Sequence, residues 1–299
     1  MFPSYLKICE SEEIEKRIEK LKDVLKDCVL CPHQCHVNRL AGEKGKCRGG
    51  ANARISSAAP HFGEESPLVG RFGSGTIFLS QCNLGCLFCQ NYDISHYDSG
   101  IDVSAEEISY HMLALQKAGC HNINFVTPTH YIPEIVEAIM IACRRGLKIP
   151  IVYNCGGYEN VEILELLDGI IDIYMPDAKF YDDKIAAKYT NAKDYSKHMK
   201  ESLIEMHRQV GDLKINKDGI AERGLLVRHL VMPGMMEDSK RILKFISDKI
   251  SSDTYVNVMG QYRPCHRANE FAEINRYPKR SEIEEVKRYA EKFGLKRGL

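Results

Sequence analysis

Short apolar runs alternate with segments of helical periodicity along most of the chain, and this alternation constrains the fold more than any other feature. The runs cover residues 75–80, 122–127, 149–154, 170–175, 225–232 and 255–260. Continuously apolar strands separated by helices are typical of a parallel sheet with both faces covered. The sequence therefore predicts an α/β fold of about six strands, either a partial or closed barrel or a doubly wound open sheet.

Helical signals flank these strands. The first predicted helix covers residues 11–27, and its apolar face consists of Ile14, Ile18, Leu21 and Leu25. Ser104 and Glu107 have the spacing of a capping box, and Ser281 with Glu284 gives a second start signal near the end of the chain. We therefore expect helices to begin at these two positions.

The chain contains no internal repeat and no long Gly/Ser linker, so a second fully independent domain is not expected. We divide it into an amino-terminal helix with a cysteine-rich extension (1–70), an α/β barrel core (71–265) and a helical extension (266–299). Asp218-Gly219 predicts the turn of a short hairpin just before the fifth strand.

Composition narrows the class of protein. Lys plus Arg (41) balances Asp plus Glu (41), so charge gives no support for nucleic-acid binding. No apolar run reaches the roughly 20 residues that cross a bilayer, and the start of the chain lacks a signal-peptide pattern, so we expect a cytoplasmic protein without a membrane partner. In that compartment the 12 cysteines favour metal binding or catalysis over disulfides.

Polar residues follow several predicted strands directly. The stretches are three cysteines after the first strand, then "TPTH", "NCGG", "PDAK", "PGM" and "QYRP" after the next five. In barrels and in open α/β sheets, ligands bind at the carboxyl ends of the strands. The sequence therefore predicts a site at this end of the sheet.

The three cysteines, Cys82, Cys86 and Cys89, stand in the stretch "CNLGCLFC" with the spacing C-x3-C-x2-C. A structural zinc site normally takes four protein ligands, and a catalytic zinc site keeps one position open. Three thiolates on one short loop suit a [4Fe-4S] cluster whose fourth iron is left for a small molecule. A zinc knuckle or three buried free cysteines are the alternatives.

This spacing, with Phe88 before the third cysteine, resembles that of radical S-adenosylmethionine (SAM) enzymes. The continuation "CQN" and the later strand ends resemble the pyruvate formate-lyase-activating-enzyme-like branch, and the resemblance covers most of residues 24–265. It implies a partial (β/α)6 TIM-like barrel in which SAM chelates the open iron. It also implies that an electron from the reduced cluster cleaves SAM to methionine and a 5'-deoxyadenosyl radical, which abstracts hydrogen from a substrate.

The resemblance also implies where SAM binds. Asp177 and Lys179 fall in an M-x-D-x-K pattern that helps to bind the SAM carboxylate in activating enzymes, although a surface salt bridge is the alternative. The family's "GGE" stretch is replaced by "TPTH", which leaves Thr127 and backbone carbonyls for the amino group. Asn154, at the end of the third strand, is also expected to bind SAM. His229 is expected to contact the nucleoside, since Arg228 and His229 face opposite ways, but a satisfied core histidine is the alternative.

A second cysteine set precedes the barrel. Cys28, Cys31, Cys35 and Cys47 have the spacing C-x2-C-x3-C-x11-C. Four thiols can close a zinc site or hold a second, fully ligated iron-sulfur cluster. Metal-free packing cysteines are the alternative.

The resemblance therefore implies a radical SAM enzyme, an oxidoreductase for which activation of a glycyl radical enzyme is the leading example. Modification of a small molecule or of RNA is the rival activity. An iron-sulfur electron carrier or a zinc-binding interaction module is the rival outside the enzyme class. The implied partners are a low-potential reductant, flavodoxin or ferredoxin, and a protein substrate.

Overall fold

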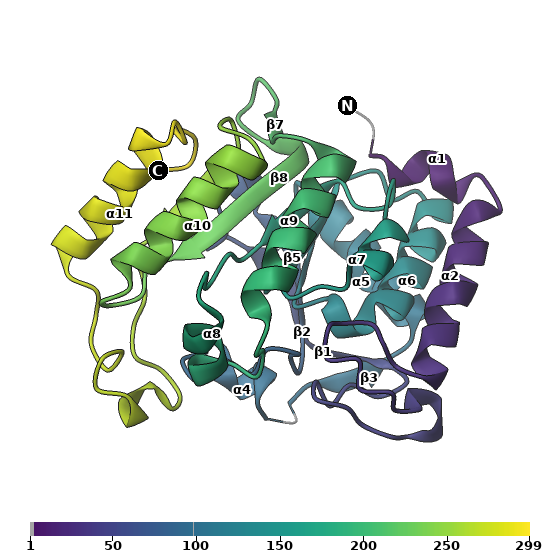
Figure 1. Cartoon of the computed structure of the whole chain (residues 1–299). Coiled ribbons are helices and arrows are strands. Elements are labelled where there is room, and N and C mark those ends of the chain that lie inside the picture. The colour runs from purple at the N-terminus through teal and green to yellow at the C-terminus, as the bar shows by residue number, and fades with distance from the viewer. Residues whose placement is uncertain (1–2, 98) are drawn as a thin grey trace.

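The computed structural model describes residues 3–97 and 99–299 and contains one large sheet. Its neighbouring strands run in the order β3, β1, β2, β4, β5, β6, β8 and β7, and β9 pairs with β8 as well (Figure 1). The strands are β1 (Ala53–His61), β2 (Ser74–Leu79), β3 (Ile101–Val103), β4 (Ile123–Val126), β5 (Ile151–Cys155), β6 (Ile173–Pro176), β7 (Lys214–Ile215), β8 (Ala221–Leu230) and β9 (Tyr255–Met259).

The predicted parallel α/β arrangement is confirmed. All six predicted strands are present as β2, β4, β5, β6, β8 and β9, and each pairs in parallel with the next. Parallel strands need crossover connections, and the helices between them supply these crossovers. The carboxyl ends of these six strands therefore meet at one end of a partial barrel.

Helices cover the outside of this sheet. The longer ones are α2 (Glu13–Asp23), α5 (Ala105–Lys117), α6 (Ile132–Arg144), α9 (Tyr195–Val210), α10 (Met236–Lys249) and α11 (Arg280–Lys292). The shorter ones are α1 (Tyr5–Cys9), α3 (Ser66–Val69), α4 (Tyr92–Ser95), α7 (Val161–Glu165), α8 (Asp183–Tyr189) and the 3-10 turns η1 (Val24–Lys26), η2 (Arg39–Ala41), η3 (Thr129–Tyr131) and η4 (Ala268–Glu270). In Figure 1, α2 packs outside α6 at one side of the sheet and α11 packs on α10 at the other.

The barrel has an apolar floor and a polar top. Val152 and Asn154 of β5 face the interior together because side chains alternate along a strand. The floor is a separate buried cluster that consists of Leu68, Val152, Ile173, Met175, Leu213, Ala221 and Leu226. Leu68 comes from α3, so this short helix closes the interior at the amino-terminal ends of the strands. The carboxyl-terminal end of the barrel interior holds a cavity instead.

The local sequence predictions agree with the structure except at the start of the last helix. The first helix is α2 extended by η1, and its four predicted core residues are buried. The capping box of Ser104 and Glu107 is present. The predicted hairpin is β7 with β8, which pair antiparallel around the turn at Gly219. The start of the last helix is corrected: α11 begins at Arg280, and Glu282 reaches back to Lys279.

Two strands were missed. β1 pairs antiparallel with β2, and β3 pairs with β1, so residues 53–61 of the predicted extension lie in the main sheet. The division of the chain at residues 70 and 265 stays a prediction. Among the described residues, no helix is both long enough and apolar enough to cross a membrane.

Candidate active site

The loop after β2 carries three thiols at the carboxyl end of the sheet. Gly85 has a φ of 55°, and a Cβ added there would lie 2.4 Å from Nδ2 of Asn191. A side chain at position 85 would therefore be both strained and obstructed. Gln81 is also left-handed, with a φ of 71°, which is costly for a residue other than glycine. The backbone of this loop therefore has an unfavourable conformation, which contacts with neighbouring segments must stabilise.

Segments distant in the sequence hold this loop. The amide of Asn191 donates to the carbonyl of Leu84 (2.8 Å), and the amide of Leu87 donates to the carbonyl of Tyr189 (2.9 Å). Phe88 is buried, and its ring centroid lies 6.0 Å from those of both Phe180 and Tyr262. The aromatic position of the cysteine motif therefore anchors the loop to the core.

The three thiols border the same cavity, and their burial disfavours the charged thiolate form. Burial raises the pKa of Cys82 to about 11, and burial also raises the pKa of the Cys86 and Cys89 thiols. The Leu84 amide donates to Sγ of Cys82 (3.3 Å). Without a metal the thiols are thus protonated, so metal binding must displace protons from them.

The cavity has a volume of about 240 Å³ and lies at the carboxyl ends of the parallel strands. Its lining includes the three thiols, Leu84, Gly156, Met259, Gln261, Thr127, Asn154, Asp177, Lys179 and Arg228. Every predicted SAM-site residue except His229 is therefore brought to this cavity. The volume is close to the lower end of the range of about 300–1,000 Å³ found for small-molecule pockets.

One wall of the cavity is a network of buried charges. Nζ of Lys179 donates to Oδ2 of Asp177 (2.5 Å), and Nε of Arg228 donates to Oδ1 of the same carboxylate (2.8 Å). Arg228 also donates from Nη2 to Oδ1 of Asn154 (2.7 Å). Asp177 therefore fixes two cations side by side, and Lys179 has two further N–H groups for an anionic ligand.

The pKa values of these groups agree with permanent charges. Burial opposes ionisation of Asp177, but the positive charges of Arg228 and Lys179 lower its pKa below the usual range. Burial likewise favours neutral Lys179, but the Asp177 carboxylate raises the lysine pKa above its usual value. The interpretation of this pair as a surface salt bridge is wrong, because both side chains are at least 84% buried, with exposed fractions of 16% and 15%.

Thr127 lies at the rim where β4 ends. Its φ is 62°, and its amide donates to the carbonyl of Asn154 (2.8 Å). A β-branched residue in this region is strained, and such strain concentrates at functional sites. Thr127 therefore forms part of the cavity wall. Its position is the one at which the family that the sequence resembles has a glycine-rich stretch.

The prediction for His229 is corrected. Nδ1 of His229 lies 2.7 Å from the carbonyl O of Ala178, and its Nε2 lies 2.8 Å from Oγ of Ser239 in α10. Its ring is buried on the outer face of β8 and does not line the cavity. The inward residue of the pair is Arg228, which the sequence reasoning passed over. The register of β8 against β6, where Asp177 is bridged to Arg228, is the signal that identifies it.

The amino-terminal cysteines form a compact loop. Cys28, Cys31 and Cys47 are buried, and Cys35 is partly exposed. The amide of Lys46 donates to Sγ of Cys35 (3.3 Å). Among residues 3–97 and 99–299, no group of three or more His, Cys, Asp or Glu side chains is arranged to hold a single metal ion.

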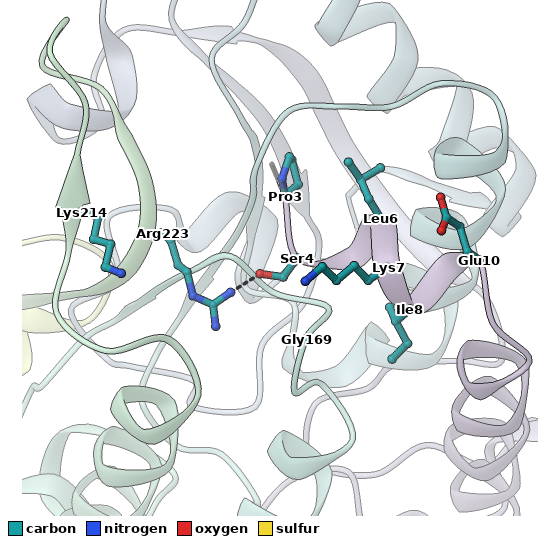
Figure 2. Close-up of a pocket in the computed structure, with 9 residues that line it drawn as sticks. All are labelled: Pro3, Ser4, Leu6, Lys7, Ile8, Glu10, Gly169, Lys214 and Arg223. Atoms are coloured by element: carbon teal, nitrogen blue, oxygen red, sulfur yellow. Dashed lines mark hydrogen bonds between the residues drawn. The ribbon is translucent and has the colours of Figure 1, made fainter. Parts of the chain in front are cut away.

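A larger hollow of about 640 Å³ lies at the opposite end of the sheet (Figure 2). It is lined by Pro3, Ser4, Leu6, Lys7, Ile8, Glu10, Gly169, Lys214 and Arg223. Figure 2 shows the Arg223 guanidinium directed at the hydroxyl of Ser4, and it also donates to the carbonyl of Gln209 (2.6 Å). Size alone does not mark a site, and this hollow contains none of the thiols.

Comparison with known proteins identifies the family. The family model of the radical SAM superfamily matches residues 76–246, more than half of the chain. The chain belongs to the radical SAM superfamily. The uncharacterized protein MJ0674 of Methanocaldococcus jannaschii is 33% identical over 291 residues, which cover 94% of this chain and 79% of that protein. The uncharacterized protein MJ0808 of the same organism is 23% identical over 280 residues, covering 84% of this chain and 75% of that protein.

Solved structures show the same fold. Methylornithine synthase (PylB) matches with a TM-score of 0.50 and 17% identity, over 74% of this chain and 63% of that one. Streptococcus suis SuiB bound to the precursor peptide SuiA matches with a TM-score of 0.50 and 14% identity, over 73% of this chain and 46% of that one. The chain thus spans less than two thirds of either protein. The predicted partial radical SAM barrel is confirmed.

Membership of the superfamily implies an enzyme with a [4Fe-4S] cluster and SAM. The residues present fit these groups, because the three thiols of the C-x3-C-x2-C loop border a cavity that paired cations also line. Cys155, a further cysteine in that lining, is buried at the end of β5. The cluster, when bound, supplies the electron for reductive cleavage of SAM. The residues of this chain supply the thiolates, the charges that orient a carboxylate and the apolar side chains that exclude water.

Proposed function

We propose that this radical SAM enzyme abstracts hydrogen from a protein, with activation of a glycyl radical enzyme as the leading case. The observation that carries the proposal is the placement of Asp177 and Lys179 of the M-x-D-x-K pattern on the cavity that the three thiols border. This pattern resembles that of the activating-enzyme-like branch. The enzyme would then be an oxidoreductase of that branch.

We assign roles to the residues on this basis. Cys82, Cys86 and Cys89 would each hold one iron. Lys179, positioned by Asp177, would bind the carboxylate of SAM, since an ammonium suits a carboxylate as a point charge. Asn154 is oriented by Arg228, and the backbone of Thr127, whose amide donates to the Asn154 carbonyl, lines the cavity beside it.

Radical SAM enzymes use a reductant, and we propose flavodoxin or ferredoxin for this role, in the cytoplasm. A low-potential electron donor of this kind suits a cluster that must pass an electron to SAM. Modification of a small molecule or of RNA remains the rival for the substrate. The cavity beside the thiols argues against the electron-carrier and zinc-module alternatives, neither of which needs it.

Deuterium transfer tests the substrate class. Reduced enzyme and SAM would be incubated with protein, RNA and small-molecule fractions of a deuterated extract from cells that encode the protein. We expect mass spectrometry to find deuterium in 5'-deoxyadenosine with the protein fraction alone, because hydrogen abstraction moves the label. A glycine-centred radical signal in that fraction would support glycyl radical activation. Transfer from the RNA or small-molecule fraction alone would contradict the proposal.

We also propose that Cys28, Cys31, Cys35 and Cys47 hold a second thiolate-bound metal, either zinc or an iron-sulfur cluster. In support, the thiols lie close enough for the charges of Cys47 and Cys35 to raise the pKa of Cys31, to which burial contributes most. The proposal requires side-chain rotation for a single ion, since the four thiols are not arranged around one point.

Metal analysis tests this second site. In protein whose Cys82, Cys86 and Cys89 are replaced with alanine, we expect about one zinc or about four irons per chain to remain. Further replacement of Cys31 and Cys47 should remove that metal. Absence of metal from the first variant, purified anaerobically and correctly folded, would show that these cysteines only pack.

A further inference from the structure

The amino-terminal cysteine loop contacts the active-site loop at two points. Nε2 of His33 lies 2.8 Å from the carbonyl O of Asn83, which stands between the first two thiols of the motif. Arg48 donates from Nη2 to the carbonyl of Ser95 (3.0 Å) and from Nη1 to the carbonyl of His96 (2.6 Å). The amino-terminal loop therefore contacts both the cysteine motif and the end of α4, which follows it.

Ser95 connects the second of these contacts to a thiol. Its Oγ donates to Sγ of Cys89 (3.2 Å), and it lies 2.8 Å from Nδ1 of His96. A serine hydroxyl has one proton, so donation to sulfur requires that Nδ1–H of His96 donates to Oγ. Nδ1–H of His96 thereby orients the hydroxyl of Ser95 toward Cys89. The carbonyl of Ser95, which accepts from Arg48, holds the backbone of the same residue in place.

Arg48 is well placed to hold this arrangement. It has a φ of 65°, which a residue other than glycine adopts at a cost, and its guanidinium binds two successive carbonyls at the end of α4. A planar guanidinium can bind two acceptors in a fixed geometry, which an ammonium cannot do equally well. The end of α4 is thus fixed in the position that brings Ser95 to the thiol.

We propose that Ser95 is a positioning residue for Cys89 and that its hydrogen bond raises the reduction potential of the cluster, with Arg48 holding Ser95 in place. Hydrogen bonds to the sulfurs are among the factors that set the potential of an iron-sulfur cluster. A donor stabilises the extra negative charge of the reduced state. This inference rests on the proposed role of Cys89 as a cluster ligand, and it gives the amino-terminal loop a part in the redox chemistry.

Redox titration of the reconstituted protein tests the proposal. In Ser95→Ala with wild-type iron content, we expect the cluster potential to become more negative and the spectrum of the reduced cluster to change. SAM cleavage should fall with flavodoxin as reductant and recover with the stronger reductant Ti(III) citrate. Ser95→Thr, which retains a hydroxyl, should restore the potential. Ser109→Ala is the matched control, because Ser109 is a buried serine whose hydroxyl donates to the carbonyl of Glu106 (2.6 Å) in α5.

Two outcomes would overturn the proposal. The first is an unchanged potential in Ser95→Ala with full iron content. The second applies if Ser95→Ala fails to hold the cluster, in which case Arg48→Lys is titrated instead. We expect its potential to shift in the same direction, and an unchanged potential would overturn the inference. The potential is measured without substrate. If the variant shifts the cluster potential but the wild-type protein forms no 5'-deoxyadenosine, this inference therefore holds and the proposed function fails.

Discussion

Replacement of Cys82, Cys86 and Cys89 with alanine is expected to remove the SAM cluster and to reduce SAM cleavage below detection. The three thiols border one cavity, and Cys155, which also lines it, is buried at the end of β5. After the loss of three ligands, Cys155 alone cannot hold a four-iron cluster, which takes thiolates on several irons. Iron and sulfide analysis after anaerobic reconstitution would measure the loss, and chromatography of 5'-deoxyadenosine would measure the activity.

A triple replacement of cysteines away from the cavity provides the control. Cys9 and Cys120 are buried in the core, Cys143 packs against it, and none of the three lines the cavity. Their replacement with alanine should leave cluster content and cleavage close to wild type, with some loss of stability because small apolar groups are removed. Equal loss of SAM cleavage in both triple variants would contradict the assignment of the ligands.

Replacement of Arg228 with methionine is expected to weaken both the fold and SAM binding. The buried carboxylate of Asp177 would lose one of its two cations, and breaking a buried ion pair in this way costs about 3–5 kcal/mol of stability. Asn154 would lose the donor that orients it. We expect SAM affinity to fall by roughly 10-fold or more, which corresponds to about 1.4 kcal/mol or more. Urea unfolding and equilibrium dialysis with SAM would measure the two effects.

Arg223→Met on the same strand is the matched control. Arg223 pairs with Lys214 of β7 in the sheet and contacts Ser4 (Figure 2). It stands near the start of β8, whereas Arg228 at the cavity is near its end. Its replacement should affect stability without changing SAM affinity. If Arg228→Met bound SAM as tightly as wild type, the buried charge network would have no part in holding the ligand.

The core of the fold could be predicted because its signals are local. Each parallel strand is a continuous apolar run, and the capping box of α5 lies within four residues. β1 was missed because its sequence, "ARISSAAPH", contains small and polar residues with Pro60 near its end, and the second half of the strand is exposed or only half-buried. Its place in the sheet depends on antiparallel pairing with β2, which no local pattern specifies.

The parts of the site that could be predicted are those whose residues lie in short contiguous motifs. The thiol loop and the pair Asp177 and Lys179 are short patterns, and they meet at the cavity. The choice between Arg228 and His229 depends on which face of β8 looks inward, which alternation alone leaves open. The contact of Arg48 with Ser95 joins segments 47 residues apart, so single-sequence reasoning has no signal for it.

Release of 5'-deoxyadenosine from SAM by the reduced, reconstituted protein tests the central claim most directly. The geometry of the cavity, which the three thiols and the Lys179 side chain line together, predicts cleavage that requires the cluster, the reductant and SAM together. A protein that carries about four irons in the Cys82 loop and is fully reduced, yet releases no 5'-deoxyadenosine and no methionine, would contradict it.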